Sequence, residues 1–267
     1  MKRKSHKNSH KNSHLFIPDT QIHAGTPIEH IEALANYAVE KKPDVIVMIG
    51  DWWDMPSLMT YEKPGAKYFH DKSYVKDIES GNAAMQLFDS IIDKEVQRIK
   101  RNKKKRWEPR KVFCMGNHEQ RILRAINSNP VLDGTIGLED FALDTWEVHN
   151  FLDVVMIDDV AYSHYFCNPD SLMGNPVGGT VENKLKLLGH SFSMGHQQRR
   201  QYGTRFTGIG KEHHGLVCGA FYSHDEDYLG PQKNRQYWRG VVMKNEVHDG
   251  SYDPCFVSLN FLVNRYL

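Results

Sequence analysis

The sequence predicts an α/β fold of the α+β kind, a sandwich of two mixed β-sheets flanked by helices. Three observations support this fold class. Short apolar, β-branched runs alternate with amphipathic helical stretches from residue 15 onward. Strand pairs typical of hairpins stand in the middle and at the end of the chain. No linker divides residues 15–267, so we expect a single domain to contain all of these elements.

Three buried strands are predicted in the first half of the chain. Each is an apolar run of the kind that a sheet buries on both faces. The runs are "HLFIPD" at 14–19, "DVIVMIGD" at 44–51 and "KVFCMGN" at 111–117. A helix is predicted between the first two, at residues 26–42. Thr26 would be its N-cap, Pro27 its first residue and Glu29 the partner that completes a capping box.

Residues 55–111 are predicted to be a helical and aromatic insertion between the second and third strands. Its first part, to residue 80, is aromatic and punctuated by Pro and Gly, and residues 82–101 repeat apolar side chains at helical spacing. Its end, "RIKRNKKKRWEPRK" at 98–111, carries nine Lys or Arg and one Glu. Such a stretch is either a solvated helix end and loop or a patch that binds phosphate backbones.

The second half predicts a hairpin, a helix and further strands. The hairpin spans 153–166 with its turn near Asp158 and Asp159, and the helix spans 180–189. Thr180 would begin this helix and Gly189 would end it. Further strand-like segments are 191–195, 216–224, 238–247 and 253–261, the last two joined by a turn at 248–252. His213 and His214 are expected in a loop.

The N-terminal residues 1–14 are predicted to be a disordered, basic and His-rich tail. The segment "SHKNSHKNSH" at 5–14 is a four-residue repeat of polar, turn-forming residues, which cannot build a packed core. The formal net charge of the whole chain is +1.

The composition also restricts which cellular compartment and which partners are expected. No run approaches the eighteen apolar residues that a membrane span needs, so no membrane partner is expected. The four cysteines are scattered without a CxxC pair, which is typical of free thiols in a reduced, cytoplasmic compartment.

Polar side chains stand at the ends of five apolar runs. In chain order these ends carry Asp19 and Gln21, Asp51 and Asp54, Asn117 and His118, His164, and finally His196 and Gln198. Ligand sites of open α/β sheets lie beyond the carboxyl ends of the strands. We therefore expect these five segments to converge on one site.

These segments resemble the motifs of the calcineurin-like metallophosphoesterases. That family's pattern is Asp-x-His, Gly-Asp-x-x-Asp, Gly-Asn-His-Asp/Glu, a separate His and Gly-His-x-His. The chain has "DTQ" at 19–21, "GDWWD" at 50–54, "GNHE" at 116–119, "SHYF" with His164 and "GHQQ" at 195–198. The resemblance spans residues 14–200, and the two middle motifs match fully. The general character of the sequence is similar to phage- or prophage-encoded members, for which the compartment would be the host cytoplasm.

The resemblance implies a dinuclear metal centre as cofactor. Two divalent ions about 3.5–4 Å apart can clamp a phosphoryl oxygen and activate a bridging water. Asp51 would be the carboxylate shared by the ions and Asp19 would bind the first ion. The implied ligands of the second ion are Asn117, His164 and His196.

The resemblance also implies a catalytic pair beside the ions. His118 would stand just outside the metal shell, where it would stabilise the phosphoryl charge or protonate the leaving oxygen. Asp54 would orient His118 through a hydrogen bond.

Both departures from the family pattern affect the first ion. The two histidines that would bind it are replaced by Gln21 and Gln198. Our hypothesis is a first site of oxygen donors, Asp19, Gln21, Asp51 and Gln198, suited to Mg²⁺ or Mn²⁺, while the second site could hold Mn²⁺, Fe or Zn²⁺. Two alternatives stay open: His23 supplies the ligand in place of Gln21, or a weak first site leaves a mononuclear centre.

The expected activity is hydrolysis of a phosphate ester, with a phosphodiesterase or nuclease as first choice. The alternatives are a phosphomonoesterase and a non-catalytic relative that binds metal or nucleic acid. Arg199 and Arg200 would bind substrate phosphate, unless they are ion-paired surface residues. Aromatic residues beside the basic stretch suit a nucleotide or single-stranded nucleic acid, or else form a hydrophobic cap. These aromatic residues are Trp52, Trp53, Tyr61, Tyr68, Phe69 and Tyr74.

Overall fold

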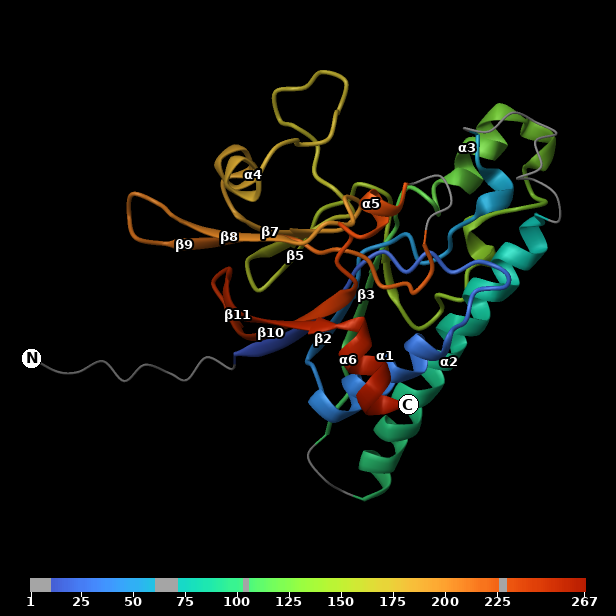
Figure 1. Ribbon diagram of the computed structural model, residues 1–267, viewed down its shortest axis with the longest axis horizontal. Helices are drawn as coiled ribbons and strands as arrows, with labels where there is room; N and C mark the ends of the chain where they lie inside the picture. Colours follow the sequence, from blue (N-terminus) through green and yellow to red (C-terminus); the bar gives the residue numbers. More distant parts are fainter. Residues whose placement is uncertain (1–10, 61–71, 103–105, 226–229) are drawn as a thin grey trace, which may run out of the picture.

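Two mixed β-sheets pack face to face in the computed structural model, and helices cover their outer faces (Figure 1). The structure describes residues 11–60, 72–102, 106–225 and 230–267. Within these ranges the two-sheet α/β prediction is confirmed. Among the described helices, none combines the length and apolar character that a membrane span needs.

The larger sheet carries the strands of the first half of the chain and of its C-terminal hairpin. Its described strands are β1 (Asn12–Ile17), β2 (Val45–Met48), β3 (Arg110–Cys114), β4 (Glu147–His149), β10 (Gly240–His248) and β11 (Ser251–Ser258). They lie in the order β11-β10-β1-β2-β3-β4, with β1 to β4 parallel, β10 antiparallel to β1 and β11 antiparallel to β10. The carboxyl ends of β1, β2 and β3 therefore meet at one edge.

The smaller sheet places two further strand ends at the same site. Its described strands are β5 (Val155–Ile157), β6 (Val160–Tyr162), β7 (Ser191–Met194), β8 (Gln201–Phe206) and β9 (Glu212–Val217), in the order β5-β6-β7-β9-β8. Strands β6, β7 and β9 run parallel, so the segments after β6 and β7 leave the sheet at one edge. The predicted hairpin is β5-β6, and its turn residues Asp158 and Asp159 both have positive φ, of 49° and 62°.

Helices cover the outside of both sheets. Those on the larger sheet are α1 (Glu29–Lys41), α2 (Tyr74–Arg101) and α6 (Leu259–Tyr266), and α4 (Val181–Leu188) covers the smaller sheet (Figure 1). The remaining short elements are α3 (Arg121–Ser128), α5 (Pro231–Asn234) and the 3₁₀ turns η1 (Pro56–Leu58), η3 (Pro130–Leu132) and η4 (Leu138–Asp140).

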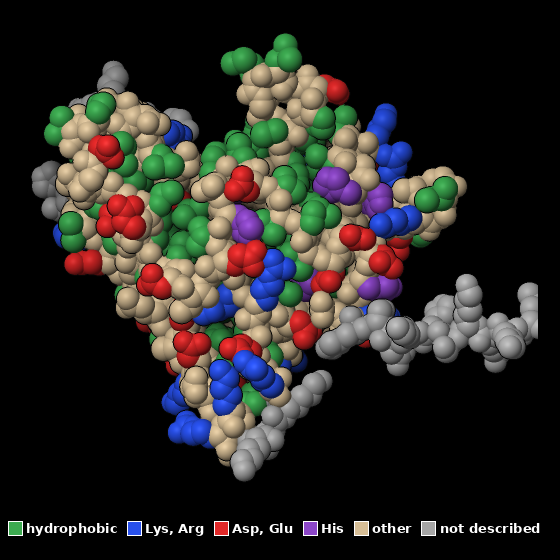
Figure 2. Space-filling view, turned by 180° about the vertical axis from the view of Figure 1, so that it is seen from behind, with side chains coloured by type: hydrophobic (Ala, Val, Ile, Leu, Met, Phe, Trp, Pro, Cys, Tyr) green, Lys and Arg blue, Asp and Glu red, His purple; other side chains and the backbone are tan. Residues whose placement is uncertain are grey.

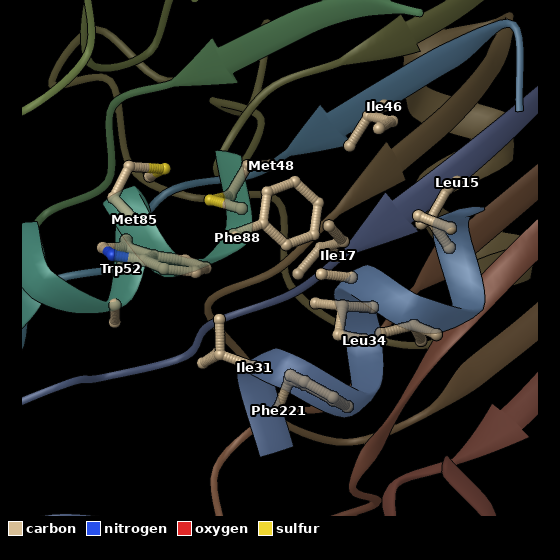
Figure 3. Close-up of a cluster of buried hydrophobic side chains, with 14 of the residues drawn as sticks. Leu15, Ile17, Ile31, Leu34, Ile46, Met48, Trp52, Met85, Phe88 and Phe221 are labelled. Atoms are coloured by element: carbon tan, nitrogen blue, oxygen red, sulfur yellow. The ribbon is translucent and has the colours of Figure 1, made fainter. Parts of the chain in front are cut away.

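The alternation of side chains along the strands builds two cores. Leu15 and Ile17 of β1 face the helices, where they join Ile31 of α1 and Phe88 of α2 (Figure 3). Phe16, between them in sequence, points the other way and packs between the sheets. A third cluster lies under α4. The packed core thus fixes β1 and β2, whose ends carry the candidate site.

Several element boundaries differ from the prediction. Helix α1 begins at Glu29, and Thr26 is not its cap, because the Thr26 hydroxyl donates to the His23 carbonyl at 2.6 Å. Helix α2 begins at Tyr74, eight positions before the predicted residue 82. The strand predicted at 253–261 ends at Ser258, whose hydroxyl accepts from the Phe261 N–H and caps α6.

In the middle of the chain, the predicted helix is observed, whereas the predicted strand is displaced. Helix α4 has the predicted ends, with Thr180 as N-cap and Gly189 in the left-handed region. The strand predicted at 216–224 overlaps β9 only at residues 216–217, and the prediction is wrong for 218–224, where only Ala220 forms isolated bridges. His213 and His214 lie in β9, not in a loop, because this strand begins at Glu212. All four cysteines are free thiols, as expected.

The last residues of the predicted disordered tail are ordered. Residues 1–10 lie outside the described residues, but Asn12 to His14 pair with β10 and β2 as the first part of β1. His14 is fully buried, with Nδ1 2.7 Å from the Tyr162 hydroxyl and Nε2 2.9 Å from Asp158 Oδ2. Burial and the nearby Lys244 ammonium lower the pKa of His14 to about 4.

Stability should fall in acid because of His14. Its pKa rises from about 4 in the folded chain to about 6.5 in the unfolded chain, so the unfolded chain binds the extra proton between these values. Acidification from pH 6.5 to 4 should therefore remove about 3 kcal/mol of the unfolding free energy. Urea unfolding of His14→Gln should lack this part of the pH dependence.

The control for this measurement is His248→Gln, which changes a half-buried histidine of β10. It should keep the acid-dependent loss of the parent. Equal pH dependence in the parent and in His14→Gln would show that His14 is not the titrating group.

Candidate metal centre

The loops after β2, β6 and β7 bring one carboxylate and two imidazoles together. Ligand atoms of Asp51, His164 and His196 lie within 4.8 Å of one another. Asn117, which follows β3, joins them through Oδ1, which is 2.9 Å from His164 Nε2 and 2.7 Å from His196 Nδ1. The four side chains predicted around the second ion are therefore brought together.

Hydrogen bonds and charges prepare His164 to act as a ligand. Its Nδ1 donates to the Ile49 carbonyl at 2.8 Å, which leaves Nε2 facing Asn117 and, at 3.3 Å, Asp51 Oδ2. An imidazole held by a backbone carbonyl in this way is typical of metal-binding histidines. Burial opposes the charged form, but the Asp51 carboxylate prevails and raises the pKa of His164 to about 9. A cation could take the place of that proton.

Asp19 adds a second buried carboxylate. It is fully buried, and both of its oxygens accept from the His196 backbone N–H, at 3.0 and 3.1 Å. Burial and the neighbouring charge of Asp51 raise the pKa of Asp19 to about 7. Among the described residues, no Lys or Arg lies within ion-pair distance of either carboxylate. Two buried carboxylates whose neighbouring bases are imidazoles, with no described Lys or Arg beside them, fit a cation between them.

The two glutamines of the predicted first site differ in their contacts. Gln21 Oε1 is buried and has no hydrogen-bond partner among the described residues. Gln198 Oε1 accepts from the Tyr222 hydroxyl at 2.6 Å. His23 turns Nδ1 to the Ala24 carbonyl and packs its ring against His224. The geometry thus favours the Gln21 oxygen over the His23 ring nitrogen as a ligand of the first ion. The Gln198 carbonyl, by contrast, already accepts a hydrogen bond from the protein.

The backbone at the site is unusual. The residues Gln21, Asp51, His196 and Gln198 have φ of 45°, 51°, 65° and 55°, in the left-handed region that side-chain-bearing residues rarely adopt. Two glycines let the loops approach each other. A Cβ on Gly50 would lie 2.3 Å from the Gly116 nitrogen, and one on Gly195 would lie 2.3 Å from Asp19 Oδ1.

Glu119 joins the turn after β2 to the turn after β3. Its fully buried carboxylate accepts from the backbone N–H groups of Asp51 and Gly116 with Oε2, at 2.9 and 2.8 Å. Oε1 accepts from Trp52 and Trp53, at 2.7 and 3.2 Å. The last residue of "GNHE" is therefore a positioning residue for Asp51, a role that the sequence alone did not assign.

The predicted pair of His118 and Asp54 is adjacent. His118 Nδ1 lies 3.0 Å from Asp54 Oδ1, and Nε2 lies 3.7 Å from Asp51 Oδ2. Burial opposes the charged imidazole, but the carboxylates of Asp51 and Asp54 prevail, and the pKa of His118 is raised.

Arg121 is a functional candidate that sequence reasoning missed. It is buried at the start of α3, and its Nη1 donates to the carbonyl oxygens of Asp54 and Met55, at 2.6 and 3.3 Å. Its Nη2 donates to His118 Nε2 at 2.9 Å. His118 is thus contacted at both ring nitrogens, by Arg121 at Nε2 and by the Asp54 carboxylate, at ion-pair distance, at Nδ1. The one sequence signal is a basic residue two positions after "GNHE".

The predicted substrate arginines do not contact the metal centre. Arg199 Nη2 donates to Gln236 Oε1 at 2.7 Å, and the Arg200 guanidinium lies over the rings of Trp238 and Phe256, 4.9 Å from each centroid. Neither is ion-paired within the described part of the chain. They directly follow Gln198 in the sequence, and their role in binding phosphate stays a prediction.

The predicted stacking aromatics are only partly accessible. Trp52 and Trp53 are fully buried core residues, which excludes base stacking and supports the hydrophobic-cap alternative for these two. Tyr74 is half-buried, and its hydroxyl donates to Asp140. Tyr61, Tyr68 and Phe69 lie outside the described residues.

No protein-family model matches the chain, and a search of curated proteins returned no match.

Proposed function

We propose that the chain is a metal-dependent phosphoesterase that hydrolyses a phosphate diester with two divalent ions as cofactors. One observation carries the proposal: side chains from five separate segments converge around Asp51, and two buried carboxylates there have no Lys or Arg partner among the described residues. The donor set fits hard or borderline divalent ions. When bound, such ions would polarise the phosphoryl oxygens and lower the pKa of a water molecule.

The residues divide into two ligand groups around Asp51. Asp19 and Gln21 would hold the first ion through oxygen, which suits Mg²⁺ or Mn²⁺. Asn117, His164 and His196 would hold the second, where the imidazoles also suit Zn²⁺ or Fe. The contact of Gln198 with Tyr222 supports a first site with fewer protein ligands than the second.

His118 would act on the phosphoryl group from outside the ligand groups. Asp54 and Arg121 fix its ring, so Nε2 stays at the edge of the centre, 3.7 Å from Asp51 Oδ2. As substrate binds, Arg121 Nη2 would turn from His118 Nε2 to the phosphoryl oxygens. The imidazole, whose pKa is raised, would then carry a proton on Nε2 and stabilise the charge that develops on the leaving oxygen.

A hydrolysis panel tests the proposal. Metal-stripped protein would be supplied with Mg²⁺, Mn²⁺ or Zn²⁺ and assayed on 4-nitrophenyl phosphate, bis(4-nitrophenyl) phosphate and single-stranded DNA. We expect hydrolysis of the diester, and His118→Ala should slow it by about 10²–10⁴-fold because a positioned acid–base group is lost. His149→Ala, which changes a histidine of β4, should retain the parent rate.

The panel separates the proposal from its alternatives. Hydrolysis of the monoester alone would indicate a phosphomonoesterase. Inactivity on every ester, with His118→Ala indistinguishable from the parent, would refute catalysis and leave a metal-binding protein.

A further inference from the structure

Two surface cavities share Trp238 as a wall. The first, of about 510 Å³, is lined by Arg199, Arg200, Gln201, Gln236 and Trp238. The second, of about 350 Å³, includes Arg235 and Arg239 in its lining. We call this pair of cavities the arginine groove, defined by Arg199, Arg200, Arg235, Trp238 and Arg239.

The arginine groove lies next to the first ligands of the centre. Asp19 forms an isolated bridge with Ala220, and Ala220 forms another with Arg239. Paired backbones lie about 4.8 Å apart, so two such steps place the Arg239 backbone about 10 Å from that of Asp19. On the other side, Arg199 directly follows Gln198. A ligand in the groove would therefore extend toward the carboxylates.

The groove arginines are poorly neutralised. Arg199, Arg200 and Arg235 have no ion pair with a carboxylate in the part of the chain that the structure describes, whereas Arg239 pairs with Asp225 at 2.6 Å. Charged side chains on a surface usually find solvent or a counter-ion, so three such guanidinium groups around one groove provide a site for an anion.

The basic stretch at 98–111 behaves in the opposite way. All of its described cations except Arg101 pair with carboxylates: Arg98 with Glu95, Lys100 and Arg106 with Glu108, Arg110 with Glu147, and Lys111 with Asp89. Arg101 donates to the Gln97 carbonyl at 3.4 Å. It also lies where α2 ends and β3 begins, at the far end of the larger sheet from the metal centre (Figure 1). Figure 2 shows basic and acidic side chains intermixed at this lower tip. The ion pairs support the solvated interpretation of the stretch.

We propose that the arginine groove binds single-stranded nucleic acid and directs it to the metal centre. Guanidinium groups bind backbone phosphates, and the Arg200 guanidinium, which lies over the half-buried Trp238 ring that borders both cavities, offers a base a stacking surface of guanidinium and ring. An acidic peptide would use the charges but not the ring, and a duplex hides its base faces. Strand cleavage rests on the proposed function, whereas strand binding does not.

Binding without metal tests the groove by itself. Fluorescence anisotropy of a labelled 12-nucleotide oligo(dT) would be measured in EDTA with the parent, with R199Q/R235Q and with K100Q/R106Q. Each double variant removes two exposed charges, the first pair from the groove and the second from the lower tip. We expect the groove variant to raise Kd at least about tenfold and to reduce the slope of log K against log salt by about 1.4, because each single-strand phosphate contact contributes about 0.7. The tip variant should bind as the parent does.

Each other outcome has a definite meaning. If both double variants weakened oligo(dT) binding equally, or if neither weakened it, the groove would be overturned as the binding site. Competition by a duplex or by poly-glutamate as strong as that by unlabelled oligo(dT) would overturn the assignment to single strands. A parent that binds the strand but hydrolyses no ester would refute the proposed function and keep the groove. Hydrolysis of bis(4-nitrophenyl) phosphate without strand binding would support the proposed function and overturn the groove. Thermal melts would confirm that both variants are folded.

Discussion

Replacing Asp51 by asparagine should weaken metal binding by more than about 100-fold, and hydrolysis should be lost with the metal. Loss of an outer partner alone costs about 10–100-fold in metal affinity, and Asp51 would be a ligand of both ions. The asparagine oxygen would still accept from the His118 N–H, as Asp51 Oδ1 does at 2.9 Å. Its NH₂ group would replace Oδ2 beside His164, where it offers a cation no lone pair.

Metal content after equilibrium dialysis against Mn²⁺ measures this effect directly. Asp159→Asn is the matched control, because it removes an exposed carboxylate from the β5-β6 turn and should leave metal content unchanged. An Asp51→Asn protein that retains the metal content of the parent would remove the central element of the proposed centre.

Glu119→Gln should cost about 3 kcal/mol or more of the unfolding free energy. The buried carboxylate accepts from four backbone N–H groups, two on each oxygen. A glutamine keeps one oxygen and turns an NH₂ group toward the other two donors, which leaves them buried and unpaired. Each unsatisfied buried donor costs about 1–3 kcal/mol, and bonds to a charged acceptor are stronger than neutral ones.

Urea unfolding with metal removed isolates this effect from ligand binding. Glu32→Gln, an exposed change in the first turns of α1, should cost less than about 1 kcal/mol and serves as the control. If Glu119→Gln matched that control, Glu119 would not hold the two turns together.

Strand ends and glycines were the parts of the site that could be predicted from the sequence. Buried parallel strands are continuous apolar runs, so their ends are visible, and polar residues after them indicate the edge where ligands bind. Asp19, Asp51, Asn117, His164 and His196 were found in this way. Their convergence follows from strand order, which periodicity does not encode.

Residues that act through the backbone could not be predicted. Glu119 and Arg121 are charged residues whose burial depends on carbonyl and N–H groups that only the folded loops present. A run of like charges is visible in sequence, but its ion pairs are not, because Glu95, Glu147 and Asp89 come from other segments. Groove arginines scattered over residues 199–239 give no run at all.

Polar edge strands and helix starts were the weak points of the fold prediction. Strand β8 is half-exposed and polar, and it exists because it pairs with β9 along its length. Strand β4 has three residues, two of them exposed, so it has no apolar pattern. Residues 259–261 look like the end of a strand by composition, yet the Ser258 cap turns them into α6.

The left-handed backbone at Gln21, Asp51, His196 and Gln198 sets chemistry against heat tolerance in this protein. Each such residue costs about 1 kcal/mol relative to glycine, so directed evolution for a higher melting temperature would favour glycine or asparagine at all four positions. The variants with the highest melting temperature would then be those in which the proposed metal-coordinating side chains have been replaced.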